Sequence, residues 1–91
     1  MSNGNWRRLY TTSAMARTVY QRLEQKRWFY GDTSLYPGAT AVSVASDLNQ
    51  SLEDVRTAVK ELSDTGLLVS LGARKGSTEP GDELWDIRYA S

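Results

Sequence analysis

The sequence predicts a mainly α-helical domain that ends in a small β-hairpin, an α+β fold of three helices and two or three strands. Three observations lead to this fold class. Apolar residues recur at helical spacing over residues 12–29 and again over residues 43–65. The second of these regions carries its own cap, turn and stop signals. Two segments of alternating apolar residues follow within residues 67–90, separated by a stretch that contains glycine and proline.

Composition limits both the size and the chemistry of the protein. A chain of 91 residues makes one domain, and 40% hydrophobic with 24% charged residues is typical of a soluble globular protein. No apolar run is long enough to span a bilayer, and the polar residues 1–5 do not resemble a signal peptide, so we expect a cytoplasmic protein with no membrane partner. The chain has no Cys and no His, which excludes disulfides, thiolate nucleophiles, imidazole bases and the usual zinc ligands. We therefore expect no metal, no cofactor and no enzymatic activity.

The first helix is predicted over residues 12–29. Thr12 or Ser13 can cap its start. One face of this helix carries five apolar residues that we assign to the core, namely Met15, Ala16, Val19, Tyr20 and Leu23. The preceding residues 1–11 are expected to form an arm or a short strand, and their pattern is too short to decide between the two.

An aromatic run closes the first helix. Trp28, Phe29 and Tyr30 are adjacent in the sequence, and aromatic side chains of this size are often buried. We expect them in the core, where the first helix meets the hairpin. A contact between two copies of the chain is the alternative.

Two helices separated by a tight turn are predicted over residues 43–65. Residues 31–41 form an irregular loop with one short extended segment that leads into Val42. Val44, Ala45 and Leu48 then give a short amphipathic helix. Asn49 tolerates a left-handed turn, and Ser51 caps the next helix, over residues 52–65. Gly66 ends that helix with a left-handed cap.

A hairpin is predicted over residues 67–90. Its first strand carries Leu67, Val69 and Leu71 in alternation, and its second carries Trp85, Ile87 and Tyr89. Residues 73–83 form the long tip.

The order of helix, short helix, tight turn, helix and hairpin resembles the winged helix-turn-helix DNA-binding family. The resemblance covers residues 40–90 and is carried by Ala45, Leu48, Ser51, Val55, Val59, Leu62, Gly66 and Leu67. It implies that residues 43–65 are the helix-turn-helix, that residues 52–65 are the recognition helix, and that residues 67–90 are the wing. Ala45 is expected to be small because the two helices cross closely there.

Four residues on the outer face of the recognition helix are the candidate DNA readers. Arg56 and Lys60 lie four residues apart and share a face. Arg can bind guanine through two hydrogen bonds, Thr57 can contact a base or a phosphate, and Glu53 can accept from a cytosine amino group. Pairing of these cations with Glu53, Glu61 or Asp64 along the helix is the alternative.

The tip of the wing and the N-terminal segment supply further candidates. Arg74 and Lys75 could reach backbone phosphates or a minor groove, or could belong to a solvated turn. Residues 1–30 carry six basic residues against one acidic residue, whereas the remainder carries five against ten. Arg7, Arg8 and the basic first helix are therefore expected to contact phosphates. The alternative is that the two parts of the chain attract each other in the folded monomer.

The net charge of the predicted helix-turn-helix argues against DNA binding. Residues 43–66 contain five carboxylates and two cations, the wrong sign for a polyanion. We nevertheless predict a small transcriptional regulator of the kind encoded in operons, viruses or plasmids. It would bind double-stranded DNA as a dimer, with half-sites about 34 Å apart, and without an effector pocket. The alternative is a protein-interaction module, a subunit or small inhibitor of a nucleic-acid machine, whose acidic helix faces a basic partner.

Overall fold

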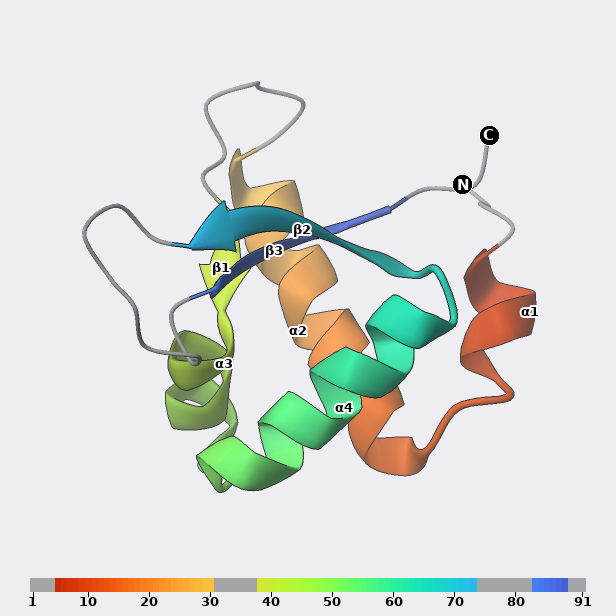
Figure 1. Ribbon diagram of the computed structural model, residues 1–91, viewed down its shortest axis with the longest axis horizontal. Helices are drawn as coiled ribbons and strands as arrows, with labels where there is room; N and C mark the ends of the chain where they lie inside the picture. Colours follow the sequence, from red (N-terminus) through yellow and green to blue (C-terminus); the bar gives the residue numbers. More distant parts are fainter. Residues whose placement is uncertain (1–4, 31–37, 74–82, 89–91) are drawn as a thin grey trace.

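The computed structural model describes residues 5–30, 38–73 and 83–88, and in these ranges the chain forms an α+β fold of four helices and one three-stranded antiparallel sheet (Figure 1). The α+β class predicted from the sequence is confirmed, with one helix more than expected. Its elements in chain order are α1 (Asn5–Leu9), α2 (Ala14–Tyr30), β1 (Ala39–Thr40), α3 (Ala41–Leu48), α4 (Leu52–Asp64), β2 (Leu68–Ala73) and β3 (Glu83–Ile87).

The additional helix is α1, and the prediction of an arm or short strand is wrong for these residues. Leu9 is completely buried and anchors α1 to the core. Thr11 donates to the carbonyl oxygen of Arg8, and Thr12 to that of Leu9, each through its backbone N–H and its hydroxyl group. These bonds give partners to carbonyl groups at the C-terminal end of α1. A five-residue helix shows no measurable periodicity, and among its described side chains, Arg7, Arg8 and Leu9, only Leu9 is buried.

Helix α2 begins one residue after Ser13, whose Oγ accepts a hydrogen bond from the backbone N–H of Ala16. Its predicted core face is confirmed, with four residues buried and Met15 partly buried. Trp28 and Phe29, in contrast, are each 84% exposed, so the prediction that they belong to the core is wrong. They lie on the side of the helix opposite Val19 and Leu23. The side chain of Tyr30 lies outside the described part of the structure.

Helix α3 begins two residues earlier than predicted because Thr40 caps it. The Thr40 Oγ1 accepts from the Ser43 N–H at 3.1 Å, and Val42 is therefore helical rather than extended. Of the predicted loop, residues 31–37 lie outside the described residues, and the short extended segment is β1. Asn49 has φ +53°, which confirms the left-handed turn.

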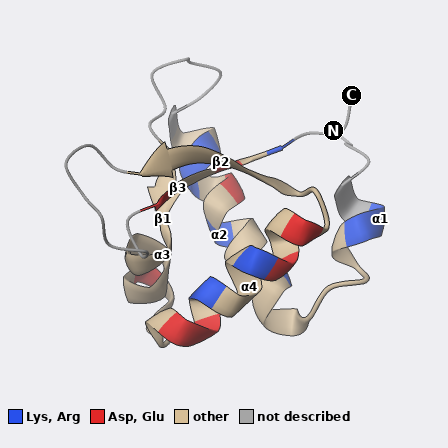
Figure 2. Ribbon diagram, viewed as in Figure 1, with Lys and Arg blue, Asp and Glu red and all other residues tan. Residues whose placement is uncertain are grey.

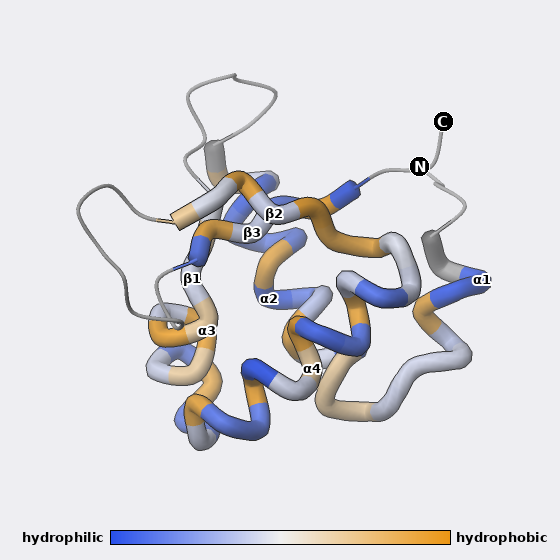
Figure 3. Tube along the Cα trace, in the orientation of Figure 1, coloured by the Kyte–Doolittle hydropathy of each residue, from blue (hydrophilic) through white to orange (hydrophobic). Residues whose placement is uncertain are grey.

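Helix α4 has the predicted caps at both ends. The Ser51 Oγ accepts from the Asp54 N–H at 3.1 Å. Gly66 has φ +82°, its N–H donates to Ser63, and the Leu67 N–H donates to Leu62, which together form a Schellman motif. Hydrophobic and hydrophilic residues alternate with the turns of α4 (Figure 3), and its buried residues are Val55, Ala58, Val59 and Leu62.

The sheet has the strand order β1-β3-β2, with Trp85 of β3 paired to Ala39 on one side and to Ser70 on the other. Leu68 and Ile87 face the core, whereas Val69 and Leu71 of β2 are exposed. The hairpin tip, residues 74–82, and Tyr89 lie outside the described residues. None of the helices that the structure describes is long and apolar enough to cross a membrane.

Candidate nucleic-acid interface

The outer face of α4 presents all four predicted reader residues. Glu53, Arg56, Thr57 and Lys60 are exposed, because the opposite side of the helix is buried against α2 and α3. Figure 2 shows the basic residues in the middle of α4 and the acidic residues toward its two ends. The structure therefore brings these four side chains to one solvent-facing surface.

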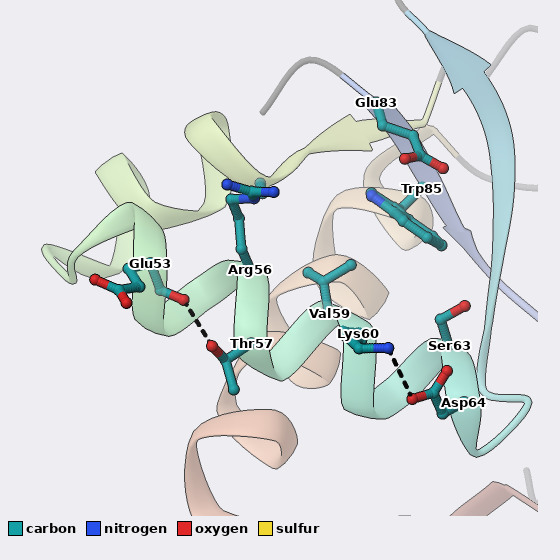
Figure 4. A pocket seen from close by; sticks show the side chains of 10 residues that line it. Glu53, Arg56, Thr57, Val59, Lys60, Ser63, Asp64, Glu83 and Trp85 are labelled. Atoms are coloured by element: carbon teal, nitrogen blue, oxygen red, sulfur yellow. Dashed lines mark hydrogen bonds and ion pairs between the residues drawn. The ribbon is translucent and has the colours of Figure 1, made fainter. Parts of the chain in front are cut away.

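An open groove of about 500 Å³ separates this face of α4 from the sheet. Arg56 rises from α4 along one side, and Trp85 and Glu83 of β3 lie across from it (Figure 4). No effector pocket is predicted from the sequence, and Trp85 and Glu83 are not among the predicted site residues. Their position depends on the register of β3 against both neighbouring strands, which no local pattern reveals.

The two cations of the α4 face differ in their bonding. Within the described part of the chain, the Arg56 guanidinium makes no hydrogen bond and no ion pair. The Lys60 Nζ lies 3.5 Å from the Asp64 Oδ2, an exposed pair within one helix. Thr57 Oγ1 donates to the Glu53 carbonyl oxygen at 3.0 Å (Figure 4). The predicted pairing along the helix is thus confirmed for Lys60 but not for Arg56.

Two of the five carboxylates in residues 43–66 have hydrogen-bond or ion-pair partners elsewhere in the fold. Glu61 accepts from the Ser13 N–H at 2.9 Å and from the Ser13 Oγ at 2.8 Å, and so fixes the start of α2. Asp47 Oδ2 lies 2.7 Å from the Lys26 Nζ and 3.1 Å from the Arg22 Nη2. Glu53 and Asp54 remain exposed in the first turn of α4, where the helix dipole stabilises negative charge.

The basic residues of α2 are engaged within the molecule. Besides the two partners of Asp47, Arg27 lies 3.6 Å from Asp86, and Arg17 donates to the Thr12 carbonyl oxygen. The attraction between a basic first part and an acidic second part, the alternative in the sequence analysis, is therefore confirmed for α2. These cations do not form a free phosphate-binding surface.

The remaining basic candidates are not gathered beside Arg56. Arg7 and Arg8 are exposed on α1, and a Cβ atom at Gly66 would lie 3.3 Å from the Arg8 Nη1. Arg8 therefore lies at the C-terminal end of α4, where a cation complements the helix dipole. Arg74 and Lys75 lie outside the described residues.

The ion pairs of Asp47 predict a pH dependence of stability. Lys26, the largest influence, and Arg22 lower the pKa of Asp47 below its usual value of 3.8. A carboxyl whose pKa is lowered by folding stabilises the protein above its unfolded pKa, and this contribution is lost as the pH falls through the folded value. We expect Asp47→Asn to cost about 0.5–1 kcal/mol at pH 7, with the difference from wild type vanishing well below pH 4. Urea denaturation at several pH values measures it.

The control for this prediction is Asp64→Asn. Its partner Lys60 is 78% exposed and Asp64 itself 68%, so we expect almost no change at any pH. A cost for Asp47→Asn that does not change with pH would contradict the ion-pair explanation.

Comparison with protein-family models, with curated proteins and with solved structures found no match to this chain. Among the described residues, no group of three or more His, Cys, Asp or Glu side chains could hold a metal ion.

Proposed function

We propose that this chain is a winged helix-turn-helix protein that binds double-stranded DNA through α4 and acts as a small, non-enzymatic transcriptional regulator. In this proposal α3, the turn at Asn49 and α4 form the helix-turn-helix, and the β2–β3 hairpin is the wing. The order of these elements and the caps of α4 support it.

The observation that carries the proposal is the guanidinium of Arg56, which has no partner among the described residues and lies in the centre of the exposed α4 face. Arg56 and Lys60 lie one helical turn apart with Thr57 beside them, and a helix of this kind fits the major groove of B-DNA. An exposed arginine without an internal partner keeps its hydrogen-bond donors for a ligand. The groove between α4 and Trp85 gives this side chain room to move toward a phosphate or a base edge.

The distribution of charge weakens the main objection to DNA binding. Asp47 is neutralised by two cations of α2, and Glu61 faces the start of α2. The charge of Asp47 is therefore largely compensated, whereas Glu61 keeps its negative charge because its partner Ser13 is neutral. The carboxylates at the two ends of α4, and Glu83 across the groove, remain near the proposed surface.

A protein-interaction module is the second candidate function. Glu53 and Asp54 are exposed in the first turn of α4, and no ion pair of either is found among the described residues. Together with Glu83 across the groove, they would suit a basic partner surface.

A duplex titration at two salt concentrations tests the proposal. We expect a mixed-sequence duplex to bind wild-type protein with a Kd of about 10⁻⁶–10⁻⁴ M at physiological salt and more tightly at lower salt. The variant Arg56→Gln/Lys60→Gln should lose about tenfold in affinity and reduce the slope of log K against log salt by about 2. The matched control Arg7→Gln/Arg8→Gln removes the same charge from α1 and should have the smaller effect.

Two outcomes would decide against the proposal. Equal losses in the two double variants would indicate a general attraction of charge instead of a surface on α4. Unmeasurable duplex affinity at about 0.05 M salt would favour the protein-interaction module.

In the DNA-binding case, Glu53→Gln/Asp54→Gln should tighten duplex binding.

A further inference from the structure

The outer side of α2 carries a continuous row of uncharged residues. Within residues 14–29, every exposed position of this helix is uncharged. These positions are Ala14, Thr18, Gln21, Gln25, Trp28 and Phe29. The first five recur at alternating steps of four and three residues, the spacing of the contact positions in a two-stranded coiled coil. We call them the outer ridge.

The absence of charge from the outer ridge is unexpected in so basic a helix. Arg17, Arg22, Lys26 and Arg27 all belong to α2, yet each has a partner elsewhere in the same molecule. Those contacts draw the cations toward α1, α3 and the sheet. The ridge that remains is about 21 Å long, from Ala14 to Trp28 at about 1.5 Å per residue.

We propose that the outer ridge binds the outer ridge of a second copy of this chain, with the two α2 helices antiparallel. In that arrangement Gln21 lies at the two-fold axis opposite its own copy. Trp28, the largest side chain of the ridge, lies opposite Ala14, the smallest. Thr18 lies opposite Gln25, and their side chains can exchange hydrogen bonds.

The residues that flank the ridge select the antiparallel orientation. Arg17 and Glu24 are both half-buried and precede Thr18 and Gln25. The Arg17 Nη1 donates to the Thr12 carbonyl oxygen, but the guanidinium keeps its other N–H donors. In an antiparallel pair these donors face Glu24 of the other copy, at positions where charge sets helix orientation. On the other flank, Met15 faces Phe29. A parallel pair would instead place Trp28 against Trp28 and Ala14 against Ala14, and would bring no opposite charges together.

The exposed aromatic area supplies a large part of the interface that a dimer needs. Trp28 and Phe29 are each 84% exposed. At about 150–250 Å² per aromatic side chain, the four rings of a dimer account for roughly 500–800 Å². A stable interface buries roughly 1,200–2,000 Å² in total, and the remaining ridge and flanking residues supply the rest. On each protomer the two rings make about 250–400 Å² of apolar surface, and patches of this size on monomers are often functional.

This inference does not rest on the proposed DNA binding. Helix α4 packs against the inner side of α2, so an interface on the outer ridge leaves the exposed face of α4 uncovered. A monomeric protein that binds duplex, or a dimer that does not, would separate the two proposals.

The test is a measurement of molar mass by light scattering or sedimentation over a range of protein concentrations. We expect the average molar mass of the wild-type protein to rise with concentration from the 10.2 kDa chain mass toward twice that value. The dimer should have a Kd of about 1–100 µM. Trp28→Ala should weaken the dimer by about 30-fold or more. Arg17→Glu and Glu24→Arg should each weaken it by about tenfold because each places like charges opposite one another. The double exchange Arg17→Glu/Glu24→Arg should restore it.

Arg56→Glu is the matched control, since it reverses the same kind of charge on the other side of the protomer and should leave the molar mass unchanged. Circular dichroism confirms that each variant is folded. A wild-type protein that stays at 10.2 kDa at all concentrations would overturn the proposal. A folded double exchange that remains as weak as either single variant would overturn it equally.

Discussion

Leu62→Ala is expected to lower the free energy of unfolding by about 2–5 kcal/mol. Leu62 is completely buried in α4, and its carbonyl oxygen accepts the hydrogen bond from Leu67 that closes the cap of the helix. Removing its side chain leaves a cavity where α4 meets the rest of the core. A domain of this size has roughly 5–13 kcal/mol of stability, so the variant should lose a large fraction of it.

Leu52→Ala is the matched control for this prediction. Leu52 is in the same helix but 39% exposed, and we expect its truncation to cost less than about 1 kcal/mol. Urea denaturation followed by circular dichroism measures both variants. Similar losses at the two positions would mean that α4 is not packed on the face that we describe.

Gly38→Ala is expected to cost about 2–4 kcal/mol. Gly38 has φ +86°, and a Cβ atom there would lie 2.9 Å from the Leu71 Cδ1 and 3.0 Å from the Trp85 carbonyl oxygen. The substitution therefore adds a steric clash to an unfavourable backbone conformation. Because β1 follows directly, the clash would disturb the sheet that holds Trp85 across from α4.

Gly72→Ala separates the cost of the steric clash from the cost of the backbone conformation. Gly72 has φ +91°, but nothing lies within 4 Å of a Cβ atom built there. We expect it to show only the backbone cost of about 1–2 kcal/mol. Thermal or urea unfolding of both variants gives the comparison, and an equal loss at Gly38 and Gly72 would disprove the close contact between Gly38 and β3.

Local signals predicted the parts of the fold that depend on local chemistry. The Ser51 cap, the left-handed Asn49 and the Gly66 stop each arise from interactions within a few residues, and each is present in the structure. Helix α1 was not predicted because it depends on the burial of Leu9 rather than on a repeated pattern. Trp28 is large and apolar, which favours burial, but its place on α2 is opposite the buried Val19 and Leu23.

The candidate site was predicted only in part, for a related reason. The exposed face of α4 follows from helical periodicity, so its four reader residues could be named from the sequence. The partners of the carboxylates could not be predicted, because they are distant in the sequence. Asp47 is 25 residues from Arg22, and Glu61 is 48 residues from Ser13. The groove likewise depends on strand order, which places Trp85 between two strands distant in sequence.

The central claim is that the exposed face of α4 is a duplex-binding surface, and amide chemical-shift mapping by NMR during titration with duplex DNA tests it most directly. We predict that the largest shifts fall on Glu53, Arg56, Thr57 and Lys60, that the indole N–H of Trp85 also moves, and that the outer ridge of α2 does not respond. Shifts confined to other surfaces, with α4 unchanged at saturating duplex, would contradict the claim.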